Sequence, residues 1–199
     1  MIIDVLNAPQ GLRYIPDFIA EEEERELLRG IATLSWSEVR MHGVVAKRRV
    51  VHFGWLYGYE SWRIEPGPPV PAFLLSLRGR AAALIGELPE RLEEVLVTEY
   101  PAGAGIGWHR DAPMFGPTVV GISLLGPCRL RFQRRTKTAR ELFVLALEPR
   151  SAYLLGGEAR SQWQHAITAT PCLRYSITFR TVRTRTSRRM TGEERSEMG

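Results

Sequence analysis

Short apolar stretches separated by Gly, Pro and charged turns fill the second half of this sequence, and they limit the fold more than any other feature. They are rich in branched and aromatic residues, and each is short enough to be one strand. Many short strands of this kind are typical of a β-sandwich or jelly roll. We therefore predict a mainly β core, with strands at 95–100, 119–125, 128–132, 142–147, 151–155 and 173–181.

The first half has a different pattern. Residues 11–17 resemble a short strand that ends in a turn, and residues 21–31 predict a helix with acidic residues in its first turn, where the helix dipole favours them. Residues 71–85 predict a second helix, with Gly86 as its stop. Between these helices, alternation around Val51 and Phe53 favours one strand. Within the aromatic and basic segment 36–71, the Tyr/Gly/Trp residues of 57–62 and the Pro-rich residues 66–69 predict long ordered loops, which in compact domains tend to be functional.

Length and composition indicate a globular protein of one domain. The chain has 199 residues, 44% of them hydrophobic and 25% charged. It has no apolar run long enough to span a bilayer and no secretory leader, so we expect a cytoplasmic protein without a membrane partner. Its two cysteines lack Cys-x-x-Cys spacing and should be reduced. The net charge of +5 permits an anionic partner such as nucleic acid, although the arginines are spread along the chain.

The strongest chemical motif lies in the Gly-rich segment 98–111. His109 and Asp111 stand two positions apart, so in an extended segment both side chains project to the same side. His165 lies far downstream. Two neutral imidazoles and one carboxylate, with other positions open, suit a non-haem Fe(II) oxygenase.

The last predicted strand adds a second half to this site. Arg174, Ser176, Thr178 and Arg180 alternate with apolar residues and would share one face. A guanidinium buried in a barrel interior requires an anion, and guanidinium groups bind carboxylates in a bidentate manner. An iron site beside such a clamp indicates a 2-oxoglutarate-dependent oxygenase. The alternative is a surface strand whose arginines are solvated.

Three motifs together resemble the AlkB family of Fe(II)/2-oxoglutarate dioxygenases. They are Tyr100 with the His-x-Asp motif of 109–111, the Gly-Gly-Glu-Ala-Arg segment 156–160 followed by His165, and the Arg-Tyr-x-x-Thr-Phe-Arg strand 174–180. The resemblance implies an α+β, mainly β fold: a double-stranded β-helix (jelly roll) with N-terminal helices on one face and an N-terminal substrate lid. It implies one domain over 1–182, with helices and lid in 1–94 and the jelly-roll core in 95–182. Residues 183–199 would form a flexible tail.

For the site, the resemblance implies that His109, Asp111 and His165 bind Fe(II), which reacts with 2-oxoglutarate and O2. Arg174 would pair with the distal carboxylate of 2-oxoglutarate, and Tyr100 would hydrogen-bond to this cosubstrate. The remaining cosubstrate contacts would come from Arg180, at the other end of 2-oxoglutarate, and from Thr98 and Ser176, which stand where the family often has Asn.

For the substrate, the resemblance implies an N-alkylated base in DNA or RNA, single-stranded or flipped out of the stack. Trp55 would stack on this base, with Tyr57 or Tyr59 nearby. The basic residues Lys47, Arg48 and Arg49 would hold phosphates. Pro113 stands where some repair members carry an acidic residue, which leaves the choice of substrate open.

The implied function is oxidative demethylation of alkylated DNA or RNA by a monomer, with release of formaldehyde and succinate. Two alternatives remain open at this stage. One is an oxygenase of the same fold that acts on protein, lipid or a small molecule. The other is a non-catalytic nucleic-acid-binding relative.

Overall fold

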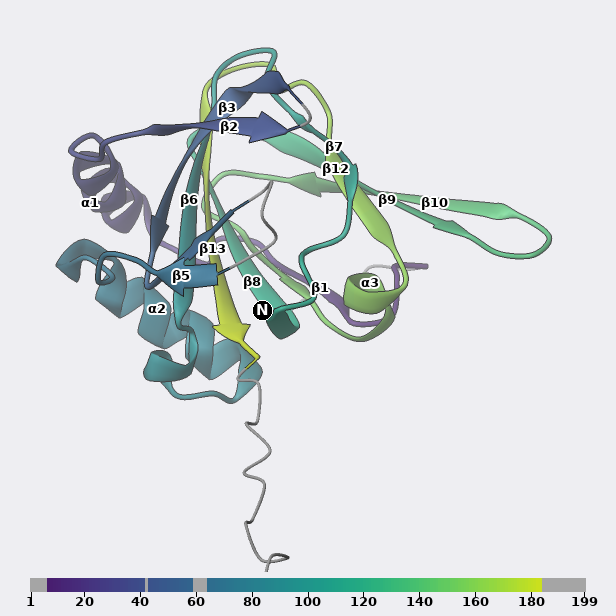
Figure 1. Cartoon of the computed structure of the whole chain (residues 1–199), viewed down its shortest axis with the longest axis horizontal. Helices are drawn as coiled ribbons and strands as arrows, with labels where there is room; N and C mark the ends of the chain where they lie inside the picture. The colour runs from purple at the N-terminus through teal and green to yellow at the C-terminus, as the bar shows by residue number, and fades with distance from the viewer. Residues whose placement is uncertain (1–6, 42, 59–63, 184–199) are drawn as a thin grey trace, which may run out of the picture.

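Two antiparallel β-sheets packed against each other form the body of the protein in the computed structural model, which describes residues 7–41, 43–58 and 64–183 (Figure 1). The larger sheet has the strand order β1-β11-β8-β13-β6-β3-β2, and the smaller has the order β10-β9-β12-β7. Neighbours in space are mostly distant in sequence, as in a jelly roll. The fold class predicted from the sequence is thus confirmed.

Each sheet combines strands from several parts of the chain. The larger sheet contains β1 (Leu12–Ile15), β2 (Ser37–Met41), β3 (Val44–Phe53), β6 (Glu94–Tyr100), β8 (Phe115–Leu124), β11 (Ala152–Leu155) and β13 (Arg174–Val182). The smaller sheet contains β7 (Ile106–His109), β9 (Cys128–Arg135), β10 (Arg140–Leu147) and β12 (Gln164–Ile167).

Both predicted helices are confirmed, and they cover the outer face of the larger sheet (Figure 1). Helix α1 (Glu21–Ile31) has the predicted bounds, and α2 (Ala72–Ile85) ends at Gly86 in the left-handed conformation. Their buried leucines, such as Leu27 and Leu77, pack with apolar residues of β6, β8 and β13. Two short helical elements were not predicted: the 3-10 helix η1 (Pro89–Arg91) and α3 (Gly157–Ser161).

Strand β13 separates the two cores of the molecule. Ile177 and Phe179 are fully buried toward the helices, while Ser176, Thr178 and Arg180 line a cavity between the sheets. The predicted alternation is therefore confirmed. Because Arg174 has no solvent exposure, the alternative of a surface strand with solvated arginines is wrong.

Residues 36–71 contain more strands than the one predicted around Val51 and Phe53, while residues 67–69 form a loop as predicted. Strands β2 and β3 extend the edge of the larger sheet, and β4 (Trp55–Tyr57) pairs with β5 (Ile64–Pro66) in a small separate sheet. Strand β3 pairs with β6 over five residues, and this tertiary pairing satisfies its backbone hydrogen-bonding groups. The charged residues of β3 gave no sequence signal for this pairing. Residues 59–63 lie outside the described part of the chain.

Strands β8, β9 and β10 are longer than predicted. Strand β9 continues to Arg135 and β10 begins at Arg140, and polar residues there pair across the hairpin. A charged stretch lacks the apolar alternation on which the prediction relied. No helix among the described residues is long and apolar enough to cross a membrane. Cys128 and Cys172 are both free, as predicted. The single domain, the lid and the flexible tail stay predictions, and residues 184–199 lie outside the described part.

Candidate active site

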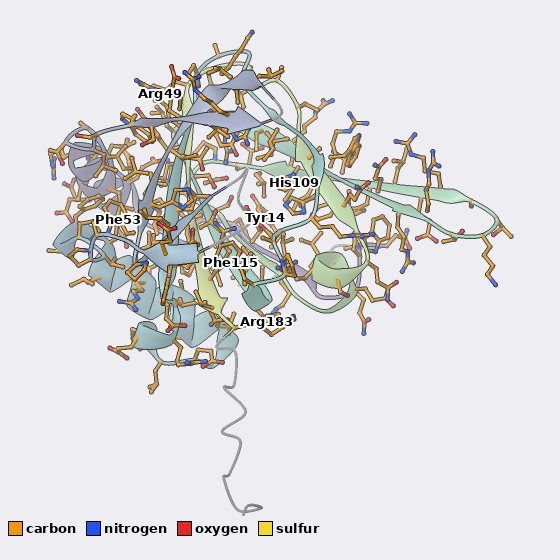
Figure 2. The ribbon with its side chains drawn as sticks, viewed as in Figure 1. Tyr14, Arg49, Phe53, His109, Phe115 and Arg183 are labelled. Carbon is orange, nitrogen blue, oxygen red and sulfur yellow. The ribbon has the colours of Figure 1, made fainter. Side chains whose placement is uncertain are left out.

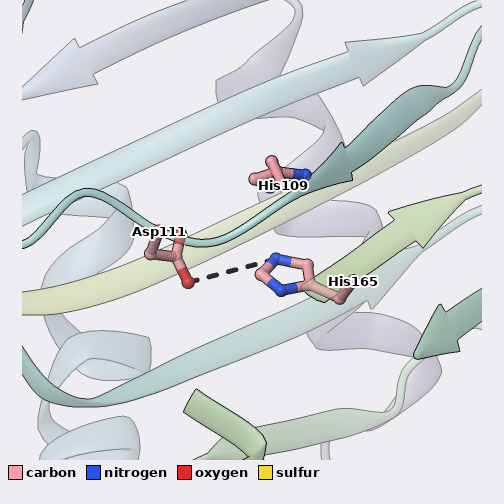
Figure 3. Close-up of side chains that lie close together, drawn as sticks. All are labelled: His109, Asp111 and His165. Carbon is pink, nitrogen blue, oxygen red and sulfur yellow. Dashed lines mark ion pairs between the residues drawn. The ribbon is translucent and has the colours of Figure 1, made fainter. Parts of the chain in front are cut away.

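Three side chains from two neighbouring strands and the adjoining loop form a candidate metal centre. His109 ends β7 and pairs in register with His165 of β12, and their ring centroids lie 4.2 Å apart. Asp111 follows on the same side of the chain as His109, and its Oδ2 lies 4.0 Å from His165 Nε2 (Figure 3). One ligand atom from each residue lies within 4.8 Å of the others, so this group could hold one metal ion.

The electrostatics of this group suit a cation. Burial lowers the pKa of His165 to about 4, and it also lowers the pKa of His109, so both imidazoles are neutral near pH 7 and can donate a lone pair. Burial raises the pKa of Asp111, but the electrostatic effect of the neighbouring His165 together with the guanidinium charges of Arg180 and Arg160 outweighs it and lowers this pKa on balance. Asp111 Oδ2 is buried without a hydrogen-bond partner in the described structure. A carboxylate oxygen in this state fits a metal ion.

A buried ion-pair chain orients Asp111. Arg180 of β13 donates from Nη1 to Asp111 Oδ1 at 3.2 Å. The same guanidinium donates from Nε and Nη2 to Glu94 of β6, at 2.7 and 2.9 Å. Glu94 has no solvent exposure, and His52 Nδ1 lies 3.2 Å from its Oε1. Partners of this kind fix the orientation of metal ligands.

Arg160 of α3 supports the same loop from the other side. Its Nη1 and Nη2 donate to the backbone carbonyls of Asp111 and Ala112, at 3.2 and 3.1 Å. Its Nε lies 3.9 Å from Asp111 Oδ2 and has no hydrogen-bond partner among the described residues. Asp111 is therefore held between two guanidinium groups, which keeps it ionised.

Arg174 gives the observation that tests the predicted cosubstrate. It is fully buried, and Nη2 donates to Ser123 Oγ at 2.8 Å, while Nε and Nη1 have no partner in the described structure. Its guanidinium lies 5.0 Å from the centre of the Tyr100 ring. An unsatisfied buried guanidinium is costly by several kcal/mol. A carboxylate such as that of 2-oxoglutarate would satisfy it, so the residues present fit this cosubstrate.

A cavity of about 390 Å³ lies between the sheets. The three candidate metal ligands open into it, together with Tyr100, Thr98 and Ser176. Thr98 and Ser176 lie opposite each other on β6 and β13. His109 and Phe115 are labelled near the centre of the molecule in Figure 2, and Arg49 at its rim. The volume of this cavity is in the range of small-ligand pockets.

The residues predicted to contact substrate lie in different places. Trp55 is half-buried against Ala112, Phe115 and Val182, beside the loop that carries Asp111, and its stacking role stays a prediction. Arg48 is buried and lines the cavity. Arg49 is half-exposed and forms an ion pair with Glu99 at 2.6 Å.

Of the other predicted contacts, Lys47 is exposed near Gly103, the side chain of Tyr57 is outside the described set, and Tyr59 lies outside the described residues. Four residues that sequence reasoning gave no role also belong to this site: Glu94, Ser123, Tyr153 and Arg160. Their chemistry depends on partners that are distant in sequence, and only the Gly-Gly-Glu-Ala-Arg segment could have indicated Arg160.

Comparisons with known proteins agree with this geometry. The sequence profile described as "2OG-Fe(II) oxygenase superfamily" matches residues 11–180. The chain is 30% identical over 190 residues to the "Alkylated DNA repair protein ALKBH8 homolog" of Arabidopsis thaliana, covering 84% of this chain and 53% of that protein. It is 28% identical to the "Probable RNA/DNA demethylase ALKBH6" of Danio rerio, covering 82% and 71%.

A third relative is the "tRNA (carboxymethyluridine(34)-5-O)-methyltransferase ALKBH8" of Mus musculus, 26% identical, of which the match covers only 24%. The chain thus spans about half or less of two of these three relatives. The solved structure of OsALKBH1 superposes with a TM-score of 0.68 and 15% identity, over 91% of this chain and 100% of that one, which shows the fold alone. The chain therefore belongs to the 2OG-Fe(II) oxygenase superfamily, and within it to the AlkB family of Fe(II)/2-oxoglutarate-dependent dioxygenases.

Proposed function

We propose that this dioxygenase demethylates N-alkylated bases in DNA or RNA, on a single strand or on a base flipped out of the stack. The observation that carries the enzymatic part is the His109–Asp111–His165 group in the cavity, together with the unsatisfied guanidinium of Arg174, which is buried against Tyr100 of the cavity wall. The nucleic-acid part rests on the relatives, whose names include an RNA/DNA demethylase, and on the basic character of the chain.

The iron and its cosubstrate would supply the oxidising chemistry: O2 and 2-oxoglutarate give succinate, CO2 and one oxygen atom for a C–H bond of the substrate. A hydroxylated N-methyl group then leaves as formaldehyde, and the proton of its hydroxyl group returns to the base nitrogen. His109, Asp111 and His165 would hold the metal. Arg174 would anchor the distal carboxylate of 2-oxoglutarate, with Tyr100, Thr98 and Ser176 as neighbouring hydroxyl groups.

The protein contributes orientation and exclusion of water. Arg180 and Arg160 hold Asp111 on both sides, so its carboxylate needs little reorganisation when the metal binds. The cavity walls are mostly apolar, with residues such as Leu96, Ile106 and Leu130, and they limit the approach of water. A target base must leave its stack to enter such a site.

Formaldehyde release across a panel of methylated oligonucleotides tests the proposal. The panel contains single- and double-stranded DNA and RNA with one N-methylated base each. We expect formaldehyde and succinate in equal amounts from at least one substrate, and neither product from the Asp111→Ala variant. Anaerobic binding of Mn(II) and 2-oxoglutarate to the wild-type chain, measured by calorimetry, is the control that the site can be loaded.

Two results would contradict the proposal. If 2-oxoglutarate is consumed but no oligonucleotide stimulates its turnover, the enzyme acts on protein, lipid or a small molecule. If the chain binds oligonucleotides but forms no succinate, and His109→Ala leaves this binding intact, it is a non-catalytic nucleic-acid-binding relative.

A further inference from the structure

The β9–β10 hairpin extends away from the body of the molecule (Figure 1). Residues 128–147 contain six basic side chains and one acidic side chain. The hairpin thus carries a net charge of +5, which equals the formal net charge of the whole chain. Figure 2 shows side chains with nitrogen at their tips along this hairpin. In the rest of the chain, basic and acidic residues are equal in number, so the excess positive charge of the protein lies in this hairpin.

The two faces of the hairpin differ. Leu130, Phe132, Leu145 and Leu147 are buried and pack toward the cavity side of the smaller sheet. The residues between them point to the opposite side, which we name the outer face. The outer face combines guanidinium groups, amides and exposed aliphatic side chains; it comprises Arg129, Arg131, Gln133 and Arg135 of β9, Arg140, Leu142, Val144 and Ala146 of β10, Gln164 of β12 and Trp108 of β7.

The charges of the outer face are not neutralised within the described structure. Glu141, the one acidic residue of the hairpin, projects to the other side and pairs with Arg134 at 2.8 Å. Within the described ranges, Arg129, Arg131 and Arg135 form no ion pair with a carboxylate. Leu142 and Val144 are 58% and 53% exposed between these guanidinium groups. An unneutralised basic strip with apolar residues suits a polyanion that also offers flat apolar groups.

The outer face is continuous with the active site through β7. Trp108 directly precedes His109, so by strand alternation the two side chains project to opposite faces of β7: the imidazole toward Asp111 and His165, and the indole toward the outer face. Arg131 lies over the Trp108 ring at 5.1 Å, a cation–π arrangement. An aromatic ring flanked by a guanidinium group is a platform on which nucleobases stack.

We propose that the outer face binds the backbone of a single-stranded nucleic acid and leads it toward the active site. The basic strip would contact phosphates, and Trp108 with the exposed aliphatic residues would contact bases that a duplex keeps inside its stack. This inference rests on the proposed function. A second copy of the chain is a poorer occupant, because it would bring the arginines of two outer faces against each other without acidic partners.

The test compares two variants with the same loss of charge. The first is Arg129→Gln/Arg131→Gln/Arg135→Gln. The control is Arg25→Gln/Arg29→Gln/Arg91→Gln, whose three exposed arginines lie on α1 and η1. Helix α1 is at the other end of the molecule from the hairpin (Figure 1). Fluorescence anisotropy gives the affinity of the full-length proteins for an unmethylated 20-nucleotide single strand at several NaCl concentrations.

We expect the hairpin variant to bind about 100-fold more weakly at 0.1 M salt, and the slope of log K against log salt to fall by about 2, since each phosphate contact on a single strand contributes about 0.7 to this slope. The control variant should stay within about 3-fold of wild type, because no phosphate contact is lost. Circular dichroism checks that all variants are folded, and Mn(II)/2-oxoglutarate affinity should be equal in all of them.

The outcomes separate this inference from the proposed function. If wild type demethylates an oligonucleotide but the hairpin variant binds single strands as wild type does, the outer face is not the binding surface. Equal losses in both variants would also overturn the inference, because they would reflect net charge alone. A dimer of wild type in sedimentation experiments that the hairpin variant abolishes would assign the face to a second copy instead. If wild type forms no formaldehyde but only the hairpin variant loses binding, the inference stands and the proposed function fails.

Discussion

Replacement of Glu94 by glutamine tests whether the buried ion-pair chain orients the metal site. Glu94 accepts two hydrogen bonds from Arg180, which in turn donates to Asp111. Glutamine keeps the shape of the side chain and one acceptor oxygen, but it removes the negative charge. The guanidinium of Arg180 would then remain buried beside Asp111 without the negative charge of Glu94.

The structure sets the size of the expected effects. Removing one member of a buried ion pair costs about 3–5 kcal/mol, because the remaining charge is desolvated without compensation. Since glutamine preserves one hydrogen bond, we expect a loss near the lower end, about 3 kcal/mol in the free energy of unfolding. Because Arg180 is then less firmly held, Asp111 should lose orientation, and metal affinity should fall by about 10–100-fold.

Urea unfolding and Mn(II) binding, followed anaerobically by electron paramagnetic resonance, measure these two quantities. Glu99→Gln is the matched control on the same strand. Its partner Arg49 has a side chain that is 48% exposed and can be hydrated when the carboxylate is lost. We therefore expect a cost of about 1 kcal/mol or less for this control, with unchanged Mn(II) affinity.

The reasoning fails if Glu94→Gln and Glu99→Gln have the same stability within error and both bind Mn(II) as wild type does. A purely structural role of Glu94 would give a different result, a loss of stability with unchanged metal affinity. A double-mutant cycle with Arg180→Gln should give a coupling energy above about 1 kcal/mol, because the two residues are in direct contact.

Three further predictions follow from the geometry. Arg174→Gln should weaken anaerobic 2-oxoglutarate binding by at least about 30-fold in calorimetry, since it removes the buried partner of a carboxylate, and unchanged affinity would refute the clamp. The folded protein without metal resists protonation of His165 down to pH about 4, whereas the unfolded chain takes up this proton near pH 6.5. Its free energy of unfolding should therefore be highest above pH 6.5 and fall by at most about 3 kcal/mol toward pH 4, and His165→Gln should remove this part of the pH dependence. Gly54→Ala should cost at least about 2 kcal/mol more than Gly43→Ala in urea unfolding. Both glycines have positive φ, 76° and 77°, but a Cβ at Gly54 would lie 1.8 Å from the carbonyl oxygen of Glu93, while at Gly43 it meets open space; equal costs would contradict the steric argument.

Local patterns were sufficient where one strand or one helix carries the signal. The alternation along 174–180 predicted which residues of β13 face the cavity, and the acidic first turn and the terminal glycine predicted both helices. The pattern failed at β2, β4 and β5. Strand β2 pairs with its neighbour β3 in a register with a shift, and β4 and β5 pair over only three residues, so none of them shows a clear alternation. It also underestimated the β9–β10 hairpin, since its charged ends have no apolar alternation.

The sequence by itself determined the jelly-roll class and the ligand types of the site, because strand periodicity and the His-x-Asp spacing are properties of neighbouring residues. Only the tertiary structure decided the partners of those ligands. Glu94 of β6 binds Arg180 of the neighbouring strand β13, and Arg160 of α3 binds the backbone carbonyl of Asp111. Arg48 lies in the cavity wall, although its neighbour Arg49 is half-exposed. Contacts between residues that are 49 to 86 positions apart depend on strand order and register, and no local pattern encodes these.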